Sequence, residues 1–177
     1  VTQFIADLQL NQKNNIMPDL KFFQELIQYL TDNQFATQFR EASGLSLLFF
    51  MLEISTNLLR SMDQQPFMSD TSQIPDEKKF GAIHQIQTII LQCVRKLMDC
   101  QQGLQQTLYH PTALFTLVKI LFDSWLQEAR ETSLFILSVL SMLPQQFNSV
   151  SFLLNAFDIY ALSHKSSRFH ALFQLGL

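Results

Sequence analysis

Glycine and proline are scarce in this chain, which has four of the first and five of the second in 177 residues. These residues supply the special backbone conformations on which tight turns between strands depend. So few of them cannot separate the many short strands of a sandwich or barrel. The shortage argues against an all-β fold and favours an all-α fold.

Cysteine is also scarce, with only Cys93 and Cys100 present. Seven residues of helix rise about 10 Å, which is too far for a disulfide within one helix. We therefore expect two free thiols, as in a reducing compartment. No histidine pair has helical i, i+4 spacing or lies near a zinc-type cysteine pair, so we expect no metal site. The four histidines are His84, His110, His164 and His170.

Charge is low, at 15% of residues, and the net charge of −3 gives no basic surface for nucleic acid. Phosphate-binding glycine loops, G-x-S-x-G and H-E-x-x-H are all missing. The acidic pair Glu128 and Glu131 suits a helix N-terminus, where negative charge complements the helix dipole, better than acid–base catalysis. We expect a protein without catalytic activity or a cofactor.

No long apolar run is present: the longest, 45–52, is interrupted by Ser46 and suits a buried helix. The first residues lack the charged-then-apolar pattern of a signal peptide. We expect neither a membrane span nor a leader. The chain starts and stops abruptly, so we expect a piece of a longer protein whose last repeat is truncated.

Helical periodicity is what the sequence does contain, together with 17 phenylalanines and 47% hydrophobic residues. Apolar residues recur every three or four positions from Ile83 to Leu97, which marks one helical face. A short helix and a loop are expected over 1–15, a short helical piece lies near Gly103, and 168–177 begins a further helix. The remaining predicted helices cover 19–30, 35–40, 45–62, 83–99, 112–122, 126–143 and 147–162.

The alternation of long and short helices has a cycle of about 45 residues, which is the period of armadillo and HEAT solenoids. We predict one all-α domain over 1–177, a right-handed superhelical solenoid of armadillo repeats. Residues 63–80 hold two prolines and a polar cluster, which predict a surface loop. The alternative is a phosphorylation or docking segment around Ser69, Thr71 and Ser72.

The helix predicted over 126–143 is apolar on two sides. One side, formed by Ala129, Ser133, Leu137 and Leu140, can face a core. The other carries Phe135, Val139 and Met142 at i, i+4 and i+7. Such a helix is either fully buried or presents one side to a ligand. The sequence alone leaves both open.

Three stretches resemble the armadillo-type regulatory domain of diaphanous-related formins, the GTPase-binding and FH3 region. They are HQIQTIILQCVRKLMDCQQGLQQTL from His84, then ALFTLVKIL, then LFILSVLSML. The upstream segment FATQFREASGLSLLFFMLEI is similar to an earlier repeat, with its Gly-Leu opening a second helix. The resemblance covers most of the chain and implies a cytoplasmic, cytoskeleton-associated protein.

In that family the concave surface binds an amphipathic helix from the protein's own C-terminal tail, which holds the actin-assembling half inactive. The resemblance places this groove on Arg95, Asp99, Val139 and Met142, and Phe135 joins it as the third residue of the apolar stripe. Two positions differ, since the family often has Asn at Asp99 and a small Ala at Val139. The bulkier valine narrows the groove. Actin itself is contacted only by the rest of the full-length protein.

The family's other ligand is a GTP-bound Rho-type GTPase. The resemblance places its contact on Gln28, Thr31, Asp32 and Asn33, of which only Asn33 keeps the Asn that the family favours. From the residues alone, 31–33 are equally well a turn that ends a helix. The competing functions are a generic armadillo or HEAT adaptor for unrelated peptides and, less favoured, a helical enzyme with a polar cavity.

Overall fold

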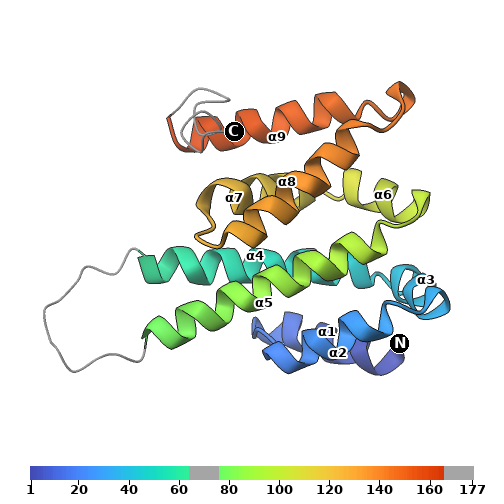
Figure 1. The fold of residues 1–177 in the computed structure, drawn as a ribbon, viewed down its shortest axis with the longest axis vertical. Helices are drawn as coiled ribbons and strands as arrows, with labels where there is room; N and C mark the ends of the chain where they lie inside the picture. Colours follow the sequence, from blue (N-terminus) through green and yellow to red (C-terminus); the bar gives the residue numbers. More distant parts are fainter. Residues whose placement is uncertain (64–75, 166–177) are drawn as a thin grey trace, which may run out of the picture. The chain divides into compact units, whose positions relative to one another are not determined.

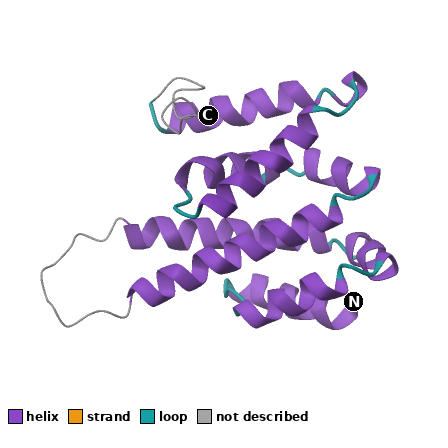
Figure 2. Cartoon of the chain, viewed as in Figure 1, coloured by secondary structure: helices purple, strands orange, loops and turns teal. Residues whose placement is uncertain are grey.

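The computed structural model describes residues 1–63 and 76–165, and all regular structure in these ranges is helical (Figure 2). The all-α class predicted from the sequence is therefore confirmed for the described residues. The chain divides into two compact units, Val1–Leu97 and Met98–Leu177. Each unit is described by itself below.

The first unit is built around two long helices, α4 and α5, which pack against each other (Figure 1). Helix α2 lies along α5, α1 packs on α4, and α3 contacts both long helices. The bounds are α1 Thr2–Asn14, α2 Leu20–Tyr29, α3 Asn33–Glu41, α4 Gly44–Asp63 and α5 Asp76–Leu97.

Short polar residues define the ends of the first helices. The Asp19 carboxylate accepts a hydrogen bond from the Phe22 N–H at 2.9 Å and so caps α2. Asn15, with φ 53°, ends α1 in the left-handed conformation that asparagine tolerates well. Helix α1 runs further than the short helix expected, through the polar residues up to Asn14.

The core of the first unit is rich in phenylalanine, as the composition suggests. Phe23, Phe39 and Phe49 are fully buried, each from a different helix. Helix α4 is buried on more than one side, as its density of leucine and phenylalanine predicts.

By length and composition alone, the stretch Gly44–Met62 of α4 is long and apolar enough to cross a membrane. The expectation of no membrane span stays a prediction. More than half of the apolar window is buried inside the structure, as is common for a core helix. The evidence that α4 crosses a membrane is accordingly weak.

A row of buried polar side chains lies where α4 and α5 meet. Gln87 on α5 is within hydrogen-bonding distance of the Ser55 and Thr56 hydroxyls of α4, at 3.4 and 3.3 Å. Thr88, the next residue on α5, is also buried, and its hydroxyl donates to the His84 carbonyl oxygen. Helix α5 is therefore covered on more than its apolar stripe.

The second unit is centred on α7, which contacts α6, α8 and α9 (Figure 1). Seven of the eleven residues of α7 are buried, which fits this position. The bounds are α6 Gln101–Leu108, α7 Ala113–Asp123, α8 Gln127–Ser141 and α9 Ser149–Ser163, with a 3-10 turn at Gln145–Phe147. Pro111 lies two residues before the first residue of α7.

The prediction of a loop over 63–80 is wrong at both ends of this range, which are helical where the structure describes them. Asp63 is the last residue of α4, and 76–80 belong to the first turns of α5. A proline at 75 followed by acidic residues is a helix-start pattern, which the loop prediction overlooked. Residues 64–75, including Ser69, Thr71 and Ser72, lie outside the described residues, as does the helix expected over 168–177.

Candidate binding surfaces

The described residues contain no group of three or more His, Cys, Asp or Glu side chains able to hold a metal ion. Both cysteines are free thiols, as predicted. Burial raises the pKa of the Cys93 thiol to about 12, so this thiol stays protonated and unreactive at neutral pH. The Cys100 sulfur accepts from the Gly103 N–H at 3.4 Å and caps α6. Both cysteines thus have structural explanations.

The His84 side chain is the least satisfied buried group of the first unit. Its residue is only 3% exposed, and neither ring nitrogen has a hydrogen-bond partner among the described residues. The imidazole meets the Phe80 ring edge-on, with centroids 4.6 Å apart. Burial lowers its pKa because the charged form loses hydration. A neutral imidazole is therefore favoured here.

The four residues predicted to contact a GTPase lie together around the turn between α2 and α3, and all four are exposed. Asp32 caps α3, because its carboxylate accepts from the Gln34 and Phe35 N–H groups at 2.7 and 2.9 Å. The Thr31 hydroxyl donates to the Gln28 carbonyl oxygen at 2.6 Å. The turn therefore has local structural roles, and it also presents four polar side chains to a partner.

An aromatic cluster stands beside this turn, and the sequence analysis missed it. Tyr29, 54% exposed, stacks on Phe35 with centroids 5.3 Å apart. Phe4 meets both rings edge-on, at 5.4 and 5.9 Å, and also meets Phe22. The rings come from α1, α2 and α3, so only the fold brings them together. Their high number in the sequence was the one available signal.

Helix α8 buries one side and exposes the other, in the division that its sequence indicates. The predicted core residues Ala129, Ser133, Leu137 and Leu140 are all buried. On the other side Phe135 is 43% and Met142 82% exposed, and Val139 between them is half-buried. We call Phe135, Val139 and Met142 the outer stripe of α8. Full burial of this helix, one of the two alternatives left open, is thereby ruled out.

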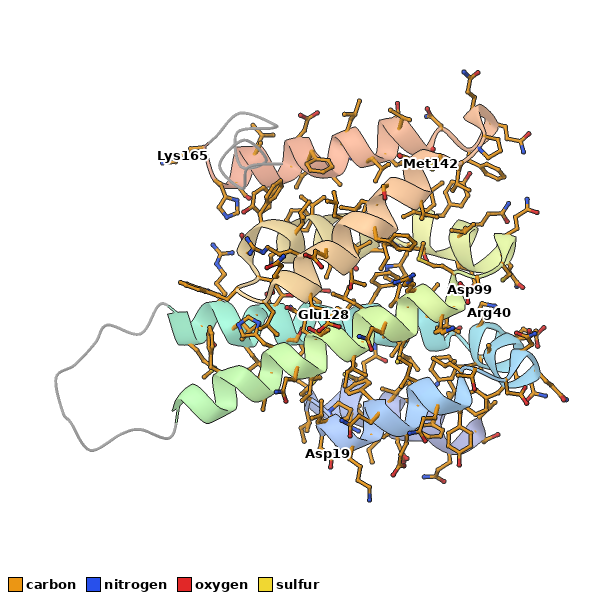
Figure 3. All side chains as sticks on the ribbon, in the orientation of Figure 1. Asp19, Arg40, Asp99, Glu128, Met142 and Lys165 are labelled. Carbon is orange, nitrogen blue, oxygen red and sulfur yellow. The ribbon has the colours of Figure 1, made fainter. Side chains whose placement is uncertain are left out.

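The other two predicted groove residues lie outside α8. Arg95 is exposed in the last turn of α5, in the first unit, where a basic residue complements the helix dipole. Asp99 is exposed in the turn between α5 and α6, at the start of the second unit (Figure 3). The structure therefore brings Phe135, Val139 and Met142 together on one helix side. Their geometry with Arg95 stays a prediction.

The chain matches no protein-family model and no curated protein. The likeness to formins therefore rests on the stretches quoted above. Those stretches coincide with described helices: ALFTLVKIL lies within α7 and LFILSVLSML ends α8. The Gly-Leu pair of the upstream stretch begins α4 at Gly44.

Proposed function

We propose that this chain is a regulatory binding domain of a diaphanous-related formin, folded as a right-handed armadillo-type solenoid. Its ligands are a GTP-bound Rho-family GTPase and the amphipathic helix of the formin's own C-terminal tail. Binding controls the assembly of actin filaments by the rest of the protein. The domain has no catalytic role and works in the cytoplasm at the cytoskeleton.

The outer stripe of α8 is the observation that carries this proposal. Phe135 on α8 is 43% exposed and Met142, the C-cap residue two turns further on, is 82% exposed, while the other side of the helix is buried. An amphipathic helix can lay its apolar side on such a stripe, as in other helix-in-groove complexes.

The polar turn at 28–33 supports the second ligand. Its four predicted contact residues are exposed and close together, and the exposed ring of Tyr29 and the half-buried ring of Phe35 lie beside the turn. Interfaces gain most of their binding energy from aromatic anchors surrounded by polar groups. The surface around the turn has both components.

The first experiment is a binding assay of the full chain against Rho-family GTPases loaded with GTP or GDP. Selective retention by a GTP-loaded protein is the expected result. A chain that binds amphipathic helices and no GTPase would instead be a generic armadillo or HEAT adaptor.

The second experiment places a carboxylate in the outer stripe with Val139→Asp. We expect tail-helix binding at least about a hundredfold weaker, because an unpaired buried charge costs about 3 kcal/mol or more. Thermal stability and GTPase binding should change little, since Val139 is already partly exposed. Ser141→Asp is the matched control, because Ser141 is exposed on α8 but off the stripe. Tail binding that survives Val139→Asp would place the tail elsewhere, and a failure to fold would make Val139 a core residue.

A further inference from the structure

A chain of hydrogen bonds runs from the turn at 28–33 to the last residue of α5. The Thr37 hydroxyl donates to the Asn33 carbonyl oxygen at 2.8 Å. The same hydroxyl oxygen accepts from Nη2 of Arg40 at 2.9 Å, and Nη1 of Arg40 donates to the Leu97 carbonyl oxygen at 3.4 Å. We call Asn33, Thr37, Arg40 and Leu97 the α3–α5 relay. All four residues belong to the first unit, in which α3 and α5 are in contact.

Arg40, labelled in Figure 3, is the member of the relay that joins the two helices. This residue is only 8% exposed, and its guanidinium donates to two neutral oxygen atoms, while its Nε has no partner among the described residues. A buried charge is costly unless it keeps its partners. The carbonyl end of α5, where the helix dipole is negative, is one of the two. Losing the Thr37 hydroxyl therefore weakens the hold of Arg40 on Leu97.

The other end of the relay depends on the Asp32 cap. Asn33 is the first residue of α3, and the Asp32 carboxylate caps this helix. Helix α3 has only nine residues. Isolated helices of this length are marginal in water, so α3 depends on its cap and its packing. A partner whose donors take the Asp32 carboxylate uncaps α3, unwinds its first turn and draws the Asn33 carbonyl oxygen away from Thr37.

We propose that the α3–α5 relay transmits the state of the turn at 28–33 to the last turn of α5, where Arg95 lies. The intact relay holds that last turn in the form that binds the tail helix. A GTPase that takes the Asp32 carboxylate breaks the relay, so each ligand lowers the affinity of the other. This consequence rests on the proposed function, which assigns the GTPase to the turn and the tail to Arg95.

The first test needs neither ligand. Asp32→Ala removes the cap of α3, and amide hydrogen exchange of residues 94–97 reports on the last turn of α5. In the otherwise unchanged chain, removing the cap should speed this exchange by a factor of about three or more. Thr37→Val keeps the side-chain shape without the hydroxyl, and in this background the same change should add less than about a factor of two. General destabilisation would speed exchange equally in both backgrounds.

The second test measures two affinities by titration calorimetry. Thr37→Val should raise the Kd of the tail helix and lower the Kd of the GTP-loaded Rho protein, each by a factor of about three or more, because the variant has already broken the relay. The opposite signs separate the relay from lost stability, since a loosened domain binds both ligands more weakly. Thr37→Ser, which keeps a hydroxyl, is the matched control and should bind both ligands like the unchanged chain.

The two tests fail separately. Equal effects of Asp32→Ala on exchange in the two backgrounds would overturn the relay, whatever the ligands do. A chain that passes the exchange test and binds no GTPase would keep the relay and overturn the proposed function. If Thr37→Val weakened both affinities together, or changed neither, the relay would not carry the coupling between the two ligands.

Discussion

Among single residues, His84 makes the stability of the fold depend on pH. Its buried imidazole lacks hydrogen-bond partners among the described residues, and desolvation lowers its pKa from 6.5. The unfolded chain then binds the proton more readily than the folded one. The stabilising contribution of neutral His84 is complete above pH 6.5 and is lost as the pH falls towards its folded pKa.

We therefore predict that mild acid destabilises the protein partly through His84. The free energy of unfolding, measured by urea titration at pH 7.5 and pH 5, should fall for the unchanged chain. His84→Leu, which removes the titrating group and keeps an apolar volume, should show a smaller fall. Equal falls in the two proteins would assign the acid sensitivity to other groups.

A second prediction concerns two glycines, Gly44 and Gly81, where substitution by alanine should change the stability in opposite directions. A Cβ at Gly44 would collide with the ring of Phe39, which is fully buried and cannot move aside. Gly44→Ala should destabilise the chain by about 1–3 kcal/mol, as overpacking does. At Gly81, inside α5, a Cβ would meet nothing within 4 Å.

Gly81→Ala should therefore stabilise the chain by about 0.5–1 kcal/mol through helix propensity alone. Thermal unfolding of both variants measures the difference. The same direction of change in both would contradict the packing around Gly44.

At the scale of elements, the Asp32 cap changes how the GTPase contact must be tested. Removing the carboxylate costs α3 its N-cap, worth about 1 kcal/mol. A charge reversal at Asp32 therefore mixes lost binding with a frayed helix. Asp32→Asn removes the charge and keeps a good capping side chain.

We predict that Asp32→Asn weakens GTPase binding while the melting temperature stays close to that of the unchanged chain. If the contact is buried, the loss is about 1–2 kcal/mol, measured by titration calorimetry. Asp19→Asn is the matched control, because Asp19 caps α2 in the same way and is not in the predicted contact. If Asp32→Asn and Asp19→Asn bound the GTPase with equal affinity, the GTPase contact would lie away from this turn.

Helices with one clear apolar stripe were predictable from the sequence, and their ends much less so. The prediction for 112–122 is within one residue of α7, and the four residues expected on the core side of α8 are buried. The start of α5 was missed because 76–79 are charged, and charge alone does not separate a loop from a helical turn. Helix boundaries depend on capping residues, and a pattern of apolar periodicity does not detect these.

Tertiary contacts set the features that the sequence did not show. Thr88 and Gln87 are polar yet buried, and the Gln87 amide nitrogen lies 3.3 Å from the Thr56 hydroxyl of α4. The ring cluster of Phe4, Tyr29 and Phe35 likewise needs three helices to meet. The periodicity of a single helix predicts neither the buried polar residues nor the ring cluster.

For the whole molecule, the proposed function requires that its two ligands influence each other. The proposed GTPase contact at 28–33 belongs to the first unit, and the outer stripe of α8 belongs to the second. If GTPase and tail helix bind overlapping or coupled surfaces, each lowers the affinity of the other. By linkage the two changes in affinity must be equal, whatever carries the coupling.

We predict that a saturating GTP-loaded Rho protein raises the Kd of the tail helix by a factor within about 5–150, the usual range of coupling energies. Saturating tail helix should raise the Kd of the GTPase by the same factor, since both routes lead to the same doubly bound state. Calorimetric titrations in both orders measure the two factors. Val139→Asp provides the control, because a chain that cannot bind the tail should keep one GTPase affinity with or without it. If neither ligand changed the Kd of the other while both were bound, the two binding surfaces would be independent. A GTPase-controlled release of the tail would then have no basis.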